Sequence, residues 1–420
     1  MVCHSRAAGF VLGLGNPQVN RARNFGGVVD NQLRAWNHIG LFKKKITVPK
    51  PETAHVSPYD KKANLDRRAR RYLHINCSVC HVSDGGGNAK FEVGYGQTKN
   101  PAKLLAEKPL HGKFGLSAAA IVKAGDPFGS VLLYRLSKWG RGRMPHVGSQ
   151  HSDEAGLNLI HDWIASLDQR PDRANLSAAL AKAEYLRLTE ELISASTDAQ
   201  RLPTVVKRAL GSPRGAFMLA RAVARETQLR SVQLAVARQG RRHPNANVRD
   251  LFERFLPLDE RTKRLGDLVN PAIIMREKGD AKRGRNIFFA GAATQCRNCH
   301  KIQNKGSDLG PDLSKIGKRY KRGEILESLL LPSKKIDPKF VTVVVLTGEG
   351  QVLTGIVVKR DKKELVLRSM EKGKATLRRL DVGDVEKIMP QKTSLMPEKL
   401  LRDMTAQQAA DLVEFLFSLK

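Results

Sequence analysis

The sequence contains few aromatic residues, few cysteines and no long apolar run. Phe, Trp and Tyr together make up 5% of the 420 residues, and there are five cysteines. So few aromatic side chains offer little surface on which nucleic-acid bases could stack. No apolar run reaches the roughly 18 residues of a membrane-spanning helix, which excludes such a helix. Four of the cysteines fall in two short motifs, so no disulfide framework remains to be built.

Acidic residues are also scarce relative to basic ones. The sequence has 73 Lys and Arg against 41 Asp and Glu, a formal net charge of +32. The basic residues are spread along the whole chain and do not form one tail or stripe, which argues against specific nucleic-acid binding. Part of this charge is an ordinary solvated surface. The rest would steer encounters with acidic partner proteins or anionic surfaces in a salt-dependent way.

The pattern Cys-x-x-Cys-His occurs twice. The two copies consist of Cys77, Cys80 and His81, and of Cys296, Cys299 and His300. This pattern is the attachment site of c-type haem, because two thiols must reach the two vinyl groups of one porphyrin and the adjacent histidine must then bind the iron. A chance match is rare in a chain of this composition, and two are far rarer. We expect two covalently bound haem c groups.

Three other uses of these cysteines fit the pattern less well. Two Cys-x-x-Cys pairs could jointly hold one zinc ion, but zinc ribbons place their pairs closer together and need no histidine after each pair. A redox-active pair would lie beside a βαβ pattern, which neither copy does. A disulfide across two intervening residues would form a strained loop and would leave both histidines unexplained. Haem attachment accounts for all six residues.

The beginning of the sequence is at odds with this cofactor. Haem c is attached outside the cytoplasmic membrane, so we expect a periplasmic or exported protein, yet the first residues lack the charged and apolar regions of a signal peptide. We therefore expect a fragment or a misplaced start. Cys3 and His4 match the end of a third Cys-x-x-Cys-His copy whose first cysteine would precede Met1. An unpaired cysteine beside an ordinary histidine is the alternative.

Hydrophobic periodicity divides the chain into four parts. Residues 1–60 are a loop-rich segment with short helices, residues 61–169 a first cytochrome c-like domain, residues 170–278 a helical linker domain, and residues 279–420 a second cytochrome c-like domain. Helices are expected at residues 65–76 before Cys77, from about residue 153 onward, through residues 170–265, at 281–290 and at 405–419. Five short strands between about residues 340 and 390 predict a small antiparallel β insertion. The expected fold is thus mainly α.

The iron of each haem has a second axial position, and methionine there is typical of an electron carrier. In the first domain the candidate is Met144, in a glycine-rich loop 63 residues after His81. His146 and His151 are rival ligands for a bis-histidine site.

The second domain offers Met396, which lies 96 residues after His300. Subtracting the β insertion restores an ordinary separation. Met389, Met370 and Met404 read as packing or surface residues. The carbonyl of Pro311 could accept a hydrogen bond from Nδ1–H of His300 and orient the ring.

These residues carry a family resemblance. The motif at Cys296, residues 310–313, 337–345, 353–355 and 394–397 together resemble the haem-binding domain of the Pirellula/Verrucomicrobium type, a class of planctomycete cytochromes c. The resemblance covers about residues 245–420. The first part is similar to di-haem cytochrome modules attached to secreted dehydrogenase or β-propeller domains, in which Gly-Asp-Pro, here residues 125–127, and Met-Pro recur. The resemblance implies electron transfer, and it implies an upstream catalytic region in such proteins.

Three function classes remain. The leading interpretation is a periplasmic di-haem carrier that accepts electrons from a dehydrogenase, as a partner or an upstream fused domain, and passes them to a respiratory acceptor. The alternative is a di-haem peroxidase in which one haem lacks a sixth ligand. Nucleic-acid binding ranks last, because it leaves both motifs unexplained.

Overall fold

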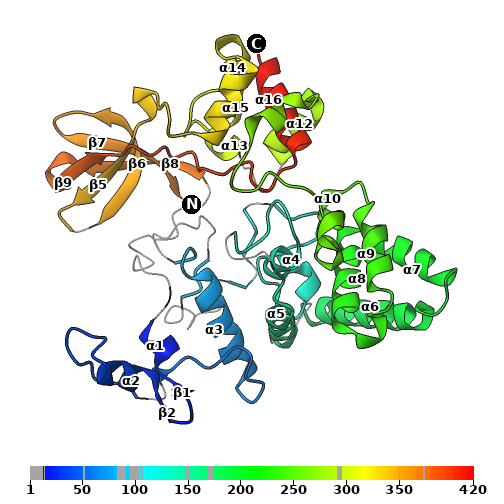
Figure 1. Ribbon diagram of the computed structural model, residues 1–420. Helices are drawn as coiled ribbons and strands as arrows, with labels where there is room; N and C mark the ends of the chain where they lie inside the picture. Colours follow the sequence, from blue (N-terminus) through cyan, green and yellow to red (C-terminus); the bar gives the residue numbers. More distant parts are fainter. Residues whose placement is uncertain are drawn as a thin grey trace.

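The computed structural model describes most of the chain, and Figure 1 shows three bodies arranged around a common centre. The described residues are 13, 15–50, 53–82, 91–94, 104–105, 107–110, 112–146, 151–167, 174–290, 296–349, 351–371 and 374–420. In this part of the chain no helix is both long and apolar enough to cross a membrane. Cys3 and His4 lie outside the described residues.

The N-terminal segment contains a hairpin as well as the short helices expected there. Its elements are α1 (Asn16–Val19), β1 (Ala22–Asn24), β2 (Val29–Asn31) and α2 (Gln32–His38). Asn31 caps α2 by accepting a hydrogen bond from the backbone N–H of Leu33 at 2.9 Å. Asn20 is buried and donates to the carbonyls of Pro49 and Lys50. Side-chain amides therefore satisfy the backbone of a segment that has little apolar core.

Near the first motif, helix α3 packs against helix α5, and α4 also packs against α5. The elements are α3 (Leu65–Cys77), α4 (Val131–Ser137) and α5 (Glu154–Ser166). The side chain of Asn64 caps α3 and that of Asp153 caps α5, as short polar residues do at helix starts. Gly156 faces the ring of Tyr72, where a Cβ atom would collide with the ring. The missing side chain lets the two helices approach closely.

The following helices share the core of this first unit. They are α6 (Ala174–Ala195), α7 (Arg201–Leu210), α8 (Pro213–Arg225), α9 (Gln233–Arg241) and α10 (Ala246–Arg249). The ring of Phe128 lies 4.8 Å from that of Tyr185 and 5.3 Å from that of Phe217. One cluster of buried side chains runs from Ala69 to Leu256. The boundary near residue 170 stays a prediction, but the apolar packing is continuous across it.

The second motif lies in a separate helical core. Its elements are α11 (Pro271–Arg276), α12 (Ala281–Ala290), α13 (Cys296–Cys299), β3 (Lys301–Ile302), β4 (Lys305–Gly306), α14 (Ile316–Arg319), α15 (Arg322–Leu330) and α16 (Ala406–Ser418). α12 packs against α16, and both begin or end within a residue or so of the positions predicted from sequence. Arg283 of α12 forms an ion pair with the buried carboxylate of Asp411 at 2.7 Å.

A glycine at this crossing predicts a mutational effect. A Cβ atom at Gly284 would collide with the carbonyl of Asp411. Gly284→Ala should therefore lower the free energy of unfolding in urea by about 1–3 kcal/mol, because the helices must separate. Gly323 of α15 has open space around it, so Gly323→Ala should leave stability unchanged or slightly raised. Equal losses in the two variants would contradict the close crossing.

A five-stranded sheet overturns the expected fold class. The strands are β5 (Thr342–Thr347), β6 (Val352–Arg360), β7 (Glu364–Glu371), β8 (Lys374–Asp381) and β9 (Val385–Pro390), all antiparallel in the order β8-β7-β6-β5-β9. They bury a core of their own around Val343, Val345, Leu365 and Leu367. Of the described residues 45% are helical and 14% are in strands. The prediction of a mainly α fold with a small β insertion was wrong, because the sheet forms a separate layer with its own apolar face.

Candidate functional site

The first motif lies at the C-terminal end of α3. Cys77 is the last residue of that helix, and its carbonyl accepts hydrogen bonds from the backbone N–H groups of Cys80 at 3.1 Å and His81 at 2.9 Å. This turn brings the side chains of Cys77, Cys80 and His81 together at one helical end. Burial, and then the neighbouring Cys80, raises the pKa of the Cys77 thiol to about 12. Neither cysteine of this motif is in a disulfide.

His81 is partly buried and its surroundings favour the neutral imidazole. Its ring stacks on Phe91 with centroids 4.5 Å apart and planes 11° from parallel. Burial, and then the nearby charges of Arg135 and His146, lower the pKa of His81 to about 4. Its Nδ1 atom is buried and has no hydrogen-bond partner among the described residues. A neutral imidazole is the form that binds a metal.

Three residues are candidates for the second axial position of the first haem, and they lie in different surroundings. Met144 is partly buried, and its backbone N–H donates to the carbonyl of Arg135 at 3.1 Å. His146 is close enough to His81 to act on its pKa, and burial together with Arg135 lowers the pKa of His146 to about 4. His151 is exposed. The structure thus brings the segment of Met144 and His146 toward His81, and it leaves His151 at the surface.

The second motif forms the short helix α13. His300 donates its backbone N–H to the carbonyl of Cys296 at 2.8 Å, so the same turn geometry is repeated. Nδ1 of His300 lies 2.9 Å from the carbonyl oxygen of Pro311. Because a carbonyl only accepts, Nδ1 carries the proton and Nε2 is the nitrogen left for a metal. The hydrogen bond expected from sequence is present, while its role beside a haem stays a prediction.

Two glycines shape the surroundings of His300. A Cβ atom at Gly310 would lie 2.7 Å from Cε1 of the imidazole ring, so only glycine allows this approach. Gly306 has φ +115°, a conformation that favours glycine, and a side chain there would collide with the carbonyl of His300. Burial lowers the pKa of His300, although its hydrogen bond to Pro311 opposes this shift. Gly310 falls in the motif of residues 310–313 that carried the family resemblance, although its contact with the ring was not predicted. Gly306 was not singled out from sequence, and a glycine in the short loop after the motif is the signal that could have found it.

The sheet and the closing segment complete the second site. Arg368 of β7 donates to the carbonyl of Asp308 at 2.8 Å, which ties the sheet to the loop that follows His300. Met396 is partly buried and packs against the helical core of this unit, and its backbone N–H donates to the hydroxyl of Ser394 at 3.1 Å. Met404 is fully buried in the same core, as expected for a packing residue.

The residues present suit covalent haem better than a bare metal ion. In the described part of the chain no group of three or more His, Cys, Asp or Glu residues is arranged to hold a metal ion. The four thiols therefore do not converge as a four-cysteine zinc site requires. Each motif instead offers two cysteines outside any disulfide beside one partly buried imidazole whose pKa is lowered by burial. The orphaned Nδ1 of His81 marks one difference between the sites, since Nδ1 of His300 has a partner.

No protein-family model matches the chain, and no curated protein matches it either.

Proposed function

We propose that the chain is an exported di-haem c-type cytochrome that transfers electrons between a dehydrogenase, as a partner or a fused domain, and a respiratory acceptor. The observation that carries the proposal is the repeated arrangement of two cysteines outside any disulfide and a partly buried imidazole, held on one helical turn by the same backbone hydrogen bond. Cys77, Cys80, Cys296 and Cys299 would bind the porphyrins, and His81 and His300 would bind the irons. When bound, haem supplies one-electron redox chemistry.

The protein's own contribution is orientation and charge. Pro311 holds the ring of His300 in one tautomer, and Phe91 holds the plane of His81. The net charge of +32 would favour encounters with acidic redox partners. The likeness to planctomycete cytochromes c supports the same function and stays a proposal.

Export of the full-length protein to the periplasm of a haem c-producing host tests this function. A pyridine haemochrome assay and denaturing mass spectrometry should show two covalent haems per chain. Absence of covalent haem would reject the proposal. A wild-type protein that shows a high-spin, five-coordinate haem and turns over peroxide would instead support the peroxidase alternative.

The sixth ligand of the first haem gives a separate prediction. Met144→Ala should convert one of the two haems to a high-spin form and lower its reduction potential, because a methionine ligand favours the reduced iron. Absorption and EPR spectra with a redox titration would measure both changes. His146→Ala and His151→Ala are the matched variants. If His146→Ala produces the high-spin haem and Met144→Ala does not, the site is bis-histidine.

A further inference from the structure

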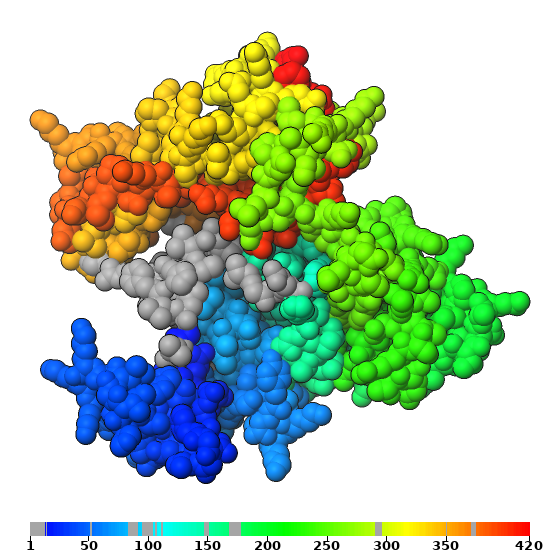
Figure 2. Space-filling model, viewed as in Figure 1, coloured from blue at the N-terminus to red at the C-terminus, as the bar shows by residue number. Residues whose placement is uncertain are grey.

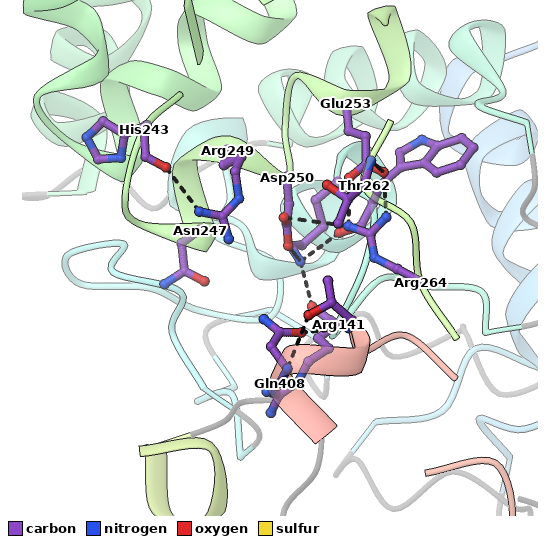
Figure 3. Close-up of polar contacts among 12 residues, drawn as sticks. Arg141, His243, Asn247, Arg249, Asp250, Glu253, Thr262, Arg264 and Gln408 are labelled. Atoms are coloured by element: carbon purple, nitrogen blue, oxygen red, sulfur yellow. Dashed lines mark hydrogen bonds and ion pairs between the residues drawn. The ribbon is translucent and has the colours of Figure 1, made fainter. Parts of the chain in front are cut away.

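The connecting segment, residues 135–146, lies between the two motifs. It begins in α4 and continues through the loop that carries Met144. Nζ of Lys138 forms a buried ion pair with Asp250 at 3.0 Å, and the backbone N–H of Trp139 donates to the carbonyl of Asp250 at 2.9 Å. Figure 3 shows Asp250 paired with Arg264, with Arg141 close to this cluster. The connecting segment is therefore anchored to the protein core.

Its beginning faces the first motif. Arg135 is largely buried, and its charge acts on both His81 and His146. No carboxylate of the described residues lies within ion-pair distance of its guanidinium, whose ring contact with Phe114 is at 5.2 Å. Burial lowers the pKa of Arg135 to about 10. A buried cation of this kind needs an anion, and porphyrin carboxylates are the anions expected in a haem site.

Its middle faces the second motif. Arg141 is also largely buried, and the Cys296 thiol is the first of the acidic groups that act on it, followed by Asp250 and Asp403. Arg141 belongs to the part of the chain that packs around the first motif (the first unit), whereas Cys296 and Asp403 belong to the part that packs around the second motif (the second unit). The carboxylate of Asp403 also acts on His146. The connecting segment thus reaches both sites.

Backbone hydrogen bonds hold the residues around Asp403 next to the chain that follows Arg264. The N–H of Leu265 donates to the carbonyl of Met404 at 2.9 Å, and that of Gly266 donates to the carbonyl of Arg402 at 2.9 Å. Arg264, the residue just before them, is paired with Glu253 at 2.6 Å and lies against Gly140. In Figure 2 the lime-coloured stretch of chain that leaves the helical region lies against the red C-terminal part. The contact between the units is therefore fixed on both sides of Asp403.

The residues of the connecting segment that face the two sites lie close together along the chain. Arg141 and Met144 are three residues apart, which spans at most about 11 Å of extended chain. We propose, on the basis of the proposed function, that residues 135–146 form a boundary shared by two haem sites, with Arg135 facing the first and Arg141 the second. Two haems held on either side of this segment would be able to exchange one electron within the molecule, from a ferrous to a ferric iron, with no bond made or broken.

Each arginine should tune mainly its own site. Reduction removes one positive charge at the iron, so a nearby cation favours the reduced form. At an effective dielectric constant of about 20, losing a nearby cation should change the equilibrium between oxidised and reduced haem by roughly tenfold. Arg141→Gln should shift the second haem toward the oxidised form by this factor and the first haem by less. Arg135→Gln should do the opposite, which makes the two variants matched controls.

The experiment is a spectroscopic redox titration of the full-length haem-loaded protein. The signals are assigned with Cys77→Ala/Cys80→Ala and Cys296→Ala/Cys299→Ala, each of which retains one motif. Arg141→Lys keeps the charge and should titrate close to the wild type. EPR of the oxidised wild-type protein supplies a measurement without substitution, because neighbouring paramagnetic irons should broaden each other's signals, and this broadening should vanish in the single-haem proteins.

The outcomes separate the two proposals. A wild-type protein without covalent haem rejects the proposed function and the shared boundary together. A protein with two haems whose EPR spectrum equals the sum of the single-haem spectra rejects the shared boundary alone. An Arg141→Gln protein that folds, binds two haems and titrates like the wild type at the second haem also rejects it.

Discussion

Replacement of both Cys77 and Cys80 by alanine is expected to reduce the covalently bound haem from two groups per chain to one. Neither cysteine of the first motif is in a disulfide, and both lie next to His81 on one turn, whereas the second motif has its own helix and its own core. The loss at one site should therefore leave the other intact. Denaturing mass spectrometry counts the haems directly, and the haemochrome absorbance should fall by half.

Cys3→Ala is the matched control for this variant. Of the five cysteines, Cys3 is the one that belongs to neither complete motif. Its replacement should leave both haems bound. If the Cys77→Ala/Cys80→Ala protein still carries two covalent haems, the first motif is not an attachment site. If it carries none, the two sites assemble together and the independence argued from their separate cores is wrong.

Asp250→Asn should lower the free energy of unfolding by about 3–5 kcal/mol, because it leaves the buried ammonium of Lys138 without its counter-charge. Only 2% of the Lys138 side chain and 9% of the Asp250 side chain are exposed. Burial lowers the pKa of Lys138, and Asp250 opposes that shift, so the variant removes the group that keeps the lysine charged. Urea unfolding of the wild type and the variant at neutral pH measures the loss.

Two further variants separate this ion pair from a general charge effect. Asp30 forms an exposed pair with Arg34 one helical turn away, so Asp30→Asn should cost no more than about 0.5 kcal/mol. Lys138→Met/Asp250→Leu removes both charges and should recover part of the stability that Asp250→Asn loses. A loss for Asp250→Asn no larger than that for Asp30→Asn would show that the buried pair does not anchor the connecting segment.

Several local features followed from the sequence. The apolar spacing around Leu73 predicted α3, and the spacing around Leu157, Ile160 and Ile164 predicted α5. The β-branched runs predicted all five strands of the large sheet within a few residues of their observed bounds. These predictions succeeded because periodicity, helix caps and turn residues act over a few neighbouring positions.

The pairing of the strands into one sheet could not be predicted from the sequence. Val343 and Val345 alternate inward, which the sequence pattern shows, but β5 also pairs with β9, about forty residues further along the chain. That pairing makes one sheet with its own core out of what reads as an insertion. Likewise Phe128 packs on Tyr185 and Phe217 and joins segments that looked like separate domains. Neither contact has a local signal in the sequence.

The sequence by itself determined the chemistry on offer: two thiols and one imidazole at each of two places, a hydrogen-bond acceptor at Pro311 and a large positive charge. Only the tertiary structure placed Gly310 against the ring of His300, Arg135 beside His81, and Arg141 of one unit beside Cys296 of another. The physical reason is range. A motif brings together residues within one helical turn, whereas contacts across 150 residues depend on how whole helices pack, which no short pattern records.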